Sequence, residues 1–259
     1  MIRVISRVLD CSPVGPNIYV MGFHSPEIAR LAQPGQFINI RVHQFYQPLL
    51  RRPFSIYRTD QDRIDIIFNV VGSGTKALIG RAAGDMIDIL GPLGCSFGVG
   101  HDYDIALLVG GGLGVAPLPM VTKAIGDTRK IATFLGARSR SQNIQTHLKN
   151  VHVATDDGSE GYHGTVVNLL RMHLKQRSYT RPMIFGCGPN VMLKALSRLA
   201  EEFNIPCEVS LESAMACGIG ICQGCPVEKT VQGSTAGEQG KYALICKEGA
   251  VFDTRTIRL

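Results

Sequence analysis

The sequence predicts an antiparallel β barrel, then a doubly wound parallel α/β domain, then a small C-terminal loop domain. Residues 1–98 contain short strand-like runs that are separated by turns, with almost no helical pattern between them. Residues 99–212 alternate strand-like and helix-like patterns, which is typical of a parallel sheet covered by helices. Residues 213–259 hold four of the eight cysteines in the chain. With 259 residues, 45% of them hydrophobic, the chain is long enough for these three parts.

The composition argues against two classes of partner. The formal net charge is +6, but Lys and Arg form no block, so we expect no nucleic acid partner. The uncharged run 105–122 is interrupted by glycines and prolines, which favours a strand, a turn and a helix start over a membrane span. The first residues, 1–7, lack the apolar core of a signal peptide. We therefore expect a cytoplasmic protein without a membrane segment.

Periodicity places the individual elements. In the first domain, alternating or continuous apolar runs predict strands over residues 18–21, 37–42, 63–68 and 85–90. In the second domain, apolar runs predict strands over 105–109, 131–135, 151–155, 183–185 and 208–211. Helical patterns lie between these strands, over 115–125, 142–149, 166–175 and 191–203.

The cysteines near the C-terminus carry the most specific chemical signal. Cys217, Cys222, Cys225 and Cys246 are separated by four, two and twenty residues. This spacing is close to that of plant-type [2Fe–2S] proteins, and thiolates are the soft ligands that iron–sulfur clusters need. Structural zinc is the alternative, but zinc sites usually contain two C-x2-C pairs, and only Cys222 and Cys225 form one here. A disulfide framework is not expected in a chain without a secretion signal.

Two turns of the α/β domain are candidates for a dinucleotide site. A glycine-rich loop follows the first strand of this domain, and ligands bind at the carboxyl ends of such strands. A second turn follows the strand 183–185 and begins with Cys187. Its thiol either lines a hydride-transfer site or is simply a small residue in a crowded turn. The candidate NAD(P) residues are Gly110, Gly111, Gly112, Gly114, Gly188 and Pro189.

The choice between NAD and NADP stays open at this point. An acidic residue about twenty positions beyond the glycine loop is typical of NAD, whereas an Arg can receive the 2′-phosphate of NADP. After the second strand the chain carries Arg138 and Arg140 and no acid. After the third strand it carries Asp156 and Asp157.

Two polar motifs of the first domain are not needed by a barrel alone. One is Arg51-Arg-Pro-Phe-Ser55, in which an Arg can clamp a phosphate and a Ser hydroxyl can bond a ring nitrogen or carbonyl. The other is Gly72-Ser-Gly-Thr75 before an apolar helical pattern, which indicates backbone N–H groups that can bind a pyrophosphate. Together the motifs resemble the FAD-binding domain of the ferredoxin reductase superfamily. The resemblance implies FAD contacts at Arg52, Pro53, Phe54, Ser55, Ile67, Phe68, Asn69, Gly74 and Thr75.

The order of barrel, dinucleotide domain and cysteine loop gives a second, whole-chain resemblance. With Ser210-Leu-Glu212 before the cysteine loop, the chain resembles the electron-transfer subunit of NAD-dependent, two-subunit dihydroorotate dehydrogenase. The resemblance implies an FMN-containing catalytic partner in a two-plus-two heterotetramer of pyrimidine biosynthesis. Electrons would pass from the partner through the [2Fe–2S] cluster and FAD to NAD, and this chain alone would not oxidise dihydroorotate.

Two other functions stay open at the level of sequence. The chain could be the reductase subunit of another redox complex, of the sulfide dehydrogenase or hydrogenase type, or a redox-sensing iron–sulfur protein that does not turn over. The segment 226–245 is longer than the family pattern, and we expect its polar part, 233–240, to loop out.

Overall fold

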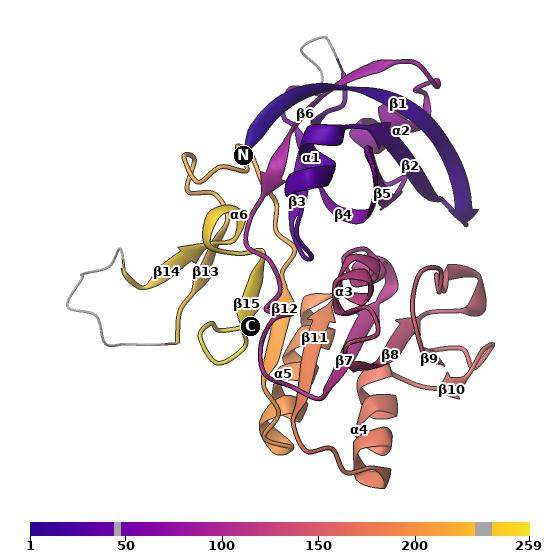
Figure 1. The fold of residues 1–259 in the computed structure, drawn as a ribbon, viewed down its shortest axis with the longest axis vertical. Coiled ribbons are helices and arrows are strands. Elements are labelled where there is room, and N and C mark those ends of the chain that lie inside the picture. Colours follow the sequence, from indigo (N-terminus) through magenta and orange to yellow (C-terminus); the bar gives the residue numbers. More distant parts are fainter. Residues whose placement is uncertain (44–47, 231–239) are drawn as a thin grey trace.

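The N-terminal part of the chain is a closed antiparallel barrel. The computed structural model describes residues 1–43, 48–230 and 240–259. The barrel strands are β1 (Ile2–Gly15), β2 (Ile18–His24), β3 (Phe37–Arg41), β4 (Arg52–Asp60), β5 (Arg63–Asn69) and β6 (Met86–Leu93). They pair in the order β1-β2-β5-β4-β3-β6, as Figure 1 shows at the top of the molecule. The predicted barrel is confirmed.

The barrel contains elements that periodicity did not reveal. β1 and β4 were not predicted as strands. The first four residues of β4 are all half-buried, and the alternation of less and more exposed positions in β1 stops after Val8. Two short helices, α1 (Pro26–Leu31) and α2 (Ser73–Ile79), interrupt the strands. Isoleucines and other apolar side chains from all six strands, from α1 and from α2 fill the interior. The first polar motif therefore begins a barrel strand, and the second forms α2.

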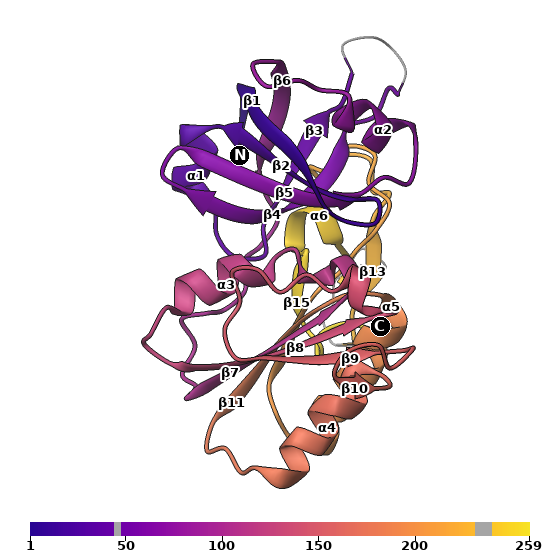
Figure 2. The same cartoon turned by 90° about the vertical axis from the view of Figure 1, so that its right-hand side faces the viewer.

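The second part is a seven-stranded sheet covered on both faces. Its strands are β7 (Ile105–Gly111), β8 (Lys130–Ala137), β9 (Val151–Thr155), β10 (Tyr162–His163), β11 (Pro182–Cys187), β12 (Cys207–Ser210) and β15 (Val251–Asp253). Their order is β10-β9-β8-β7-β11-β12-β15, with β15 alone antiparallel to its neighbour. Two separate apolar cores lie on the two faces. One contains α3 (Leu118–Ile125), and the other contains α4 (Val166–Gln176) and α5 (Asn190–Glu202), as Figure 2 shows.

The helix predicted over 142–149 was wrong. A single 3-10 turn, Arg140–Gln142, is followed by irregular chain. Ile144 is the only fully buried side chain of the segment, so no apolar face stabilises a helix there. His147 has a positive φ of 64°, and Thr146 Oγ1 is 2.6 Å from the hydroxyl of Tyr57 in the barrel. The segment thus serves as a contact between the domains.

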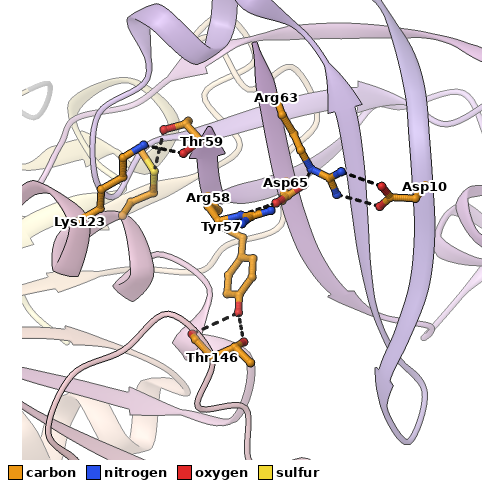
Figure 3. A network of polar contacts seen from close by, with 9 residues as sticks. Asp10, Tyr57, Arg58, Thr59, Arg63, Asp65, Lys123 and Thr146 are labelled. Carbon is orange, nitrogen blue, oxygen red and sulfur yellow. Dashed lines mark hydrogen bonds and ion pairs between the residues drawn. The ribbon is translucent and has the colours of Figure 1, made fainter. Parts of the chain in front are cut away.

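Side-chain contacts join the barrel to the α/β domain, and Figure 3 shows them around Tyr57. Lys123 Nζ, on α3, donates to the backbone carbonyl of Thr59 on β4 at 2.7 Å. Behind this contact, Asp65 accepts from Nε of both Arg58 and Arg63, at 2.7 and 2.6 Å. The side chain of Asp65 is only 2% exposed, so the pair of guanidinium groups compensates its buried charge.

The C-terminal segment packs on both domains. After β12, the chain runs upward beside the barrel, then forms β13 (Pro226–Glu228), β14 (Tyr242–Leu244) and α6 (Ile245–Glu248) before it returns to the sheet as β15 (Figure 1). Cys225, Ile245 and Cys246 belong to the same apolar core as α4 and α5. The polar loop expected over 233–240 lies, except for Gly240, outside the described residues. Within the described chain, no helix has the length and apolar character to cross a membrane.

Candidate functional site: a cavity and a cysteine loop

A cavity of about 530 Å³ lies where the barrel, the sheet and the C-terminal segment meet. This volume is within the roughly 300–1,000 Å³ that is usual for a site that binds a small molecule or cofactor. The barrel wall includes all nine residues for which the sequence predicted FAD contacts. They are Arg52, Pro53, Phe54, Ser55, Ile67, Phe68, Asn69, Gly74 and Thr75.

The barrel wall fits a polar, flat cofactor in two respects. The Oδ1 atom of Asn69 is buried at this wall and has no hydrogen-bond partner within the described chain. A buried acceptor without a donor is costly, so a ligand N–H or O–H here would be stabilising. Among the residues that the structure describes, the guanidinium of Arg52 has no carboxylate partner and donates to the backbone carbonyls of Leu50 and Arg51. It therefore keeps a full positive charge for an anionic group such as a phosphate.

The α/β domain contributes Leu113, Ala116 and Cys187 to the cavity. Cys187 is 3% exposed, and burial, together with the nearby charge of Glu212, raises the pKa of its thiol to about 12. The side chain is thus a neutral thiol at physiological pH, which can line a site but is a poor nucleophile. The turn is also crowded, because a Cβ on Gly114 would lie 2.0 Å from the carbonyl oxygen of Cys187.

None of the six predicted NAD(P) residues is among the residues that line the cavity. Gly110 and Gly111 end β7, Gly112 and Gly114 lie in the turn that follows it, and Gly188 and Pro189 follow β11. These two turns contact each other: Cβ atoms built on Gly111 and Gly188 would both collide with the thioether of Met192. The two loops therefore form one surface beside the cavity, at the carboxyl edge of the sheet, where ligands of such sheets bind.

The C-terminal segment supplies cavity residues to which the sequence analysis gave no role. These include Glu212 and Met215, while Phe37 comes from β3 and Ala250 precedes β15. Partial removal of water by the surrounding protein raises the pKa of Glu212. In the sequence, Glu212 appeared only as the last residue of Ser210-Leu-Glu212, with no predicted role in a cavity. Phe37 appeared as one apolar residue of a strand, with no signal that it faces a ligand site.

The four cysteines of the C-terminal segment meet as two pairs. Cys217 Sγ accepts N–H bonds from Ile219 and Cys222, each at 3.4 Å, and these bonds, that of Cys222 first, lower the pKa of Cys217 to about 6. The N–H of Cys246 donates to Cys225 Sγ at 3.4 Å. Burial, and then the neighbouring sulfur of Cys225, raises the pKa of Cys246 to about 12, and the charge of Cys217 adds to this effect.

The four cysteines fit an iron–sulfur centre in the number and type of the ligands that they offer. A [2Fe–2S] cluster takes two protein ligands on each of two irons, and the cysteines meet here as two pairs. The N–H groups directed at Cys217 stabilise the thiolate form that such a cluster requires.

Comparison with known proteins identifies the family. The model of the iron–sulfur cluster binding domain of dihydroorotate dehydrogenase B matches residues 212–258. A protein of Desulforamulus reducens, the electron transfer subunit of dihydroorotate dehydrogenase B (NAD(+)), is 37% identical over 256 residues, which are 95% of each chain. The chain belongs to this family of electron transfer subunits. The corresponding subunit of Bacillus caldolyticus is 36% identical over 92% of each chain.

A solved structure has a fold similar to that of this chain. It is that of an NADH-dependent reduced ferredoxin-NADP oxidoreductase, described in terms of flavin-based electron bifurcation. It is 28% identical and superimposes with a TM-score of 0.85, covering 98% of this chain and 90% of the other. The family resemblance predicted from the order of the three parts and from Ser210-Leu-Glu212 before the cysteine loop is confirmed by the family model and the relatives.

Proposed function

We propose that this chain is the electron transfer subunit of a dihydroorotate dehydrogenase. It passes electrons from an FMN-containing catalytic subunit through a [2Fe–2S] cluster and FAD to NAD, in cytoplasmic pyrimidine biosynthesis. One observation supports this function most directly. A single cavity is lined by the barrel motifs, by Cys187 of the α/β domain and by Met215, two residues before the first cysteine of the loop. A relay of cofactors requires such a meeting point.

FAD, when bound, supplies the conversion between single electrons and a hydride. Arg52 is suited to hold its pyrophosphate, because its guanidinium is uncompensated and lies beside Gly74. Asn69 is suited to accept a hydrogen bond from the flavin, because its Oδ1 lacks a donor. Cys187 keeps its proton and gives the nicotinamide side of the cavity a small, uncharged wall. We propose the same division of labour along the chain: FAD on 1–98, NAD(P) on 99–212 and the cluster on 213–259.

We propose that Cys217, Cys222, Cys225 and Cys246 are the ligands of the cluster. Cys222 is exposed, whereas Cys225 and Cys246 are 3% and 2% exposed. One edge of the site therefore faces solvent while the other is anchored in the core. An exposed edge is where electrons can arrive from a docked catalytic subunit, since electron transfer needs close approach.

NAD is the nucleotide that the charges at the carboxyl edge of the sheet favour. The backbone N–H groups of Asp156 and Asp157 donate to the carbonyls of Ala137 and Arg138, so the turns after β8 and β9 lie against each other. Ser159 N–H and O–H bonds lower the pKa of Asp157, which is therefore ionised at neutral pH. A 2′-phosphate that approached Arg138 would also meet these carboxylates, whereas a ribose hydroxyl could donate to Asp156.

Co-expression with a catalytic subunit tests the proposal. The two chains are purified through a tag on one of them, and NAD reduction by dihydroorotate is followed at 340 nm. We expect this activity only in the complex, with FMN and FAD both present, and a mass that corresponds to two copies of each chain. If no complex forms, or if dihydroorotate leaves the FAD and the cluster oxidised, the reductase subunit of another redox complex becomes the better assignment.

The redox-sensor alternative is separated by a test on this chain alone. A reductase module should pass electrons from NADH to an artificial acceptor in many turnovers. A sensor should be reduced once and then stop. Measuring NADH and NADPH in parallel also decides the nucleotide.

A further inference from the structure

Asn39 occupies an unusual position on the barrel. The side chains of β3 alternate: Ile38 and Ile40 belong to the apolar interior, whereas Phe37 belongs to the core formed with the C-terminal segment. Asn39 shares the outer face with Phe37, because side chains two apart on a strand point the same way. An outer-face residue is usually solvated, yet Asn39 is 0% exposed. The cysteine loop is what covers it.

The contact between Asn39 and the loop is specific. The Nδ2 atom of Asn39 donates to the backbone carbonyl of Cys217 at 3.3 Å. A Cβ on the next residue, Gly218, would lie only 2.2 Å from that Nδ2, and Gly218 has a φ of +72°. Glycine is therefore required here both by the backbone conformation and by the close approach of Asn39. The amide of Asn39 lies directly against the Cys217–Gly218 peptide.

The carbonyl end of the Asn39 side chain shows that packing alone does not account for a polar residue at this position. Oδ1 of Asn39 is buried and has no hydrogen-bond partner within the described chain. An unpaired buried acceptor is destabilising, and an apolar side chain would avoid that cost. The stabilising element at this position is the donor, and its partner in the described part of the chain is the Cys217 carbonyl of the cysteine loop. If the amide were turned over, Oδ1 of Asn39 would face the carbonyl oxygen of Cys217, and two acceptors would lie against each other.

We propose that Asn39 is a positioning residue for the cluster: it fixes the Cys217 peptide to the strand that also lines the cofactor cavity. Phe37 borders the cavity, and Asn39 holds the cluster loop two residues later on the same strand. β3 thus keeps the two redox sites at one separation and places an N–H dipole next to a ligand of the cluster. The inference rests on the proposed function, since it assigns the cysteines to a cluster.

The test compares three variants of the purified holoprotein. Asn39→Leu removes the amide with little change in volume, and Asn39→Asp keeps the shape but replaces the donor by an acceptor. Thr133→Val is the matched control. It deletes another fully buried donor, the Thr133 Oγ1 that bonds the Lys149 carbonyl at 2.8 Å, in the α/β sheet. Each protein is characterised by iron release to a chelator, by EPR after reduction with dithionite, and by the midpoint potential of the cluster.

We expect both Asn39 variants to release iron about 10- to 100-fold faster than the parent protein, the range usual for residues that orient metal ligands. We also expect altered EPR g values and a lower midpoint potential, because a dipole that stabilises the added electron is lost. Thr133→Val should change only thermal stability. If Asn39→Leu folds poorly, the iron release, EPR spectrum and midpoint potential of Asn39→Asp decide whether the proposal holds.

The proposal would be overturned if the Asn39 variants had the same iron release, EPR spectrum and midpoint potential as the parent protein. So would equal changes in Thr133→Val, since these would show a general loss of stability. None of these readouts uses NADH or dihydroorotate. A failure of the proposed function would instead appear in the unmodified protein, as a cluster that dithionite reduces but NADH does not.

Discussion

A methyl group added at Gly74 should weaken FAD binding through Arg52. The Cβ of Gly74→Ala would lie 3.0 Å from Nε and 3.2 Å from Cγ of Arg52. Arg52 cannot yield freely, because its Nη1 donates to the Leu50 carbonyl at 2.7 Å. Gly80 ends the same helix and is not among the residues that line the cavity, so it offers a matched control: a Cβ there meets nothing closer than 3.6 Å, and its φ of −81° suits any residue.

The size of the effect can be bounded. Deleting the guanidinium with Arg52→Ala removes a charge-assisted contact worth about 1.5–3 kcal/mol, a roughly 10- to 100-fold loss of FAD affinity. Gly74→Ala only displaces that group, and overpacking of this kind costs about 1 kcal/mol or more. We therefore expect a loss of at least roughly fivefold, and no larger than that of Arg52→Ala. Gly80→Ala should leave FAD affinity unchanged.

Fluorescence titration of the apoprotein with FAD measures these affinities, and the double variant completes the cycle. If the methyl group acts through Arg52, adding Gly74→Ala to Arg52→Ala should cost nothing further, because the colliding side chain is gone. An equal loss in both backgrounds would show that Gly74 acts on the cofactor directly. An unchanged affinity in Arg52→Ala would refute the role of Arg52 altogether.

Three further predictions concern the cluster and the barrel. Cys222→Ser should abolish the EPR signal of the cluster and electron exchange with a partner, while FAD content and NADH-to-dye activity remain; equal loss of all of these would indicate a structural metal site. In the apoprotein, the lowered pKa of Cys217 means that its thiolate persists as the pH falls from 9 toward 6. Iodoacetamide should therefore modify Cys217 at pH 7 well before Cys187, whose pKa is about 12. Mass spectrometry of the labelled peptides measures this order. Asp65→Asn should lower the free energy of unfolding by about 3–5 kcal/mol because it leaves two guanidinium groups without their buried partner. Asp10→Asn disrupts a pair that is partly exposed and should cost about 1 kcal/mol; similar losses in denaturant melts would contradict this difference.

The fold was predictable where apolar periodicity is strong. β7 is buried at all seven positions and appears in the sequence as a continuous apolar run. β4 is different, because its first four residues are half-buried at the cavity and include Arg52 and Ser55. The polar residues that line the cavity interrupt the apolar pattern by which a strand is predicted. The helix expected over 142–149 is absent because only Ile144 of this segment is buried, and the contact of the segment with Tyr57 is one that no local pattern encodes.

The candidate site was predictable to the extent that its chemistry depends on spacing. The intervals between the four cysteines indicated a cluster, because a short loop must bring most of its ligands together locally. Asn39 gave no such signal. It is one polar residue in the run Phe-Ile-Asn-Ile, and its contact with Cys217 spans 178 positions. Such pairings depend on how the C-terminal segment folds back on the barrel.

The glycine loop after β7 shows why motif spacing alone misjudges this family. The loop departs from G-x-G-x-x-G, but the structure gives its glycines a packing reason. The Cβ of a residue at 114 would lie 2.0 Å from the carbonyl oxygen of Cys187, and at 111 it would lie 2.5 Å from the sulfur of Met192. The turns after β7 and β11 are thereby pressed together, and Cys187 is held at the cavity wall. The glycines thus act on the site through Cys187: they set how closely the second turn approaches the barrel wall of the cavity.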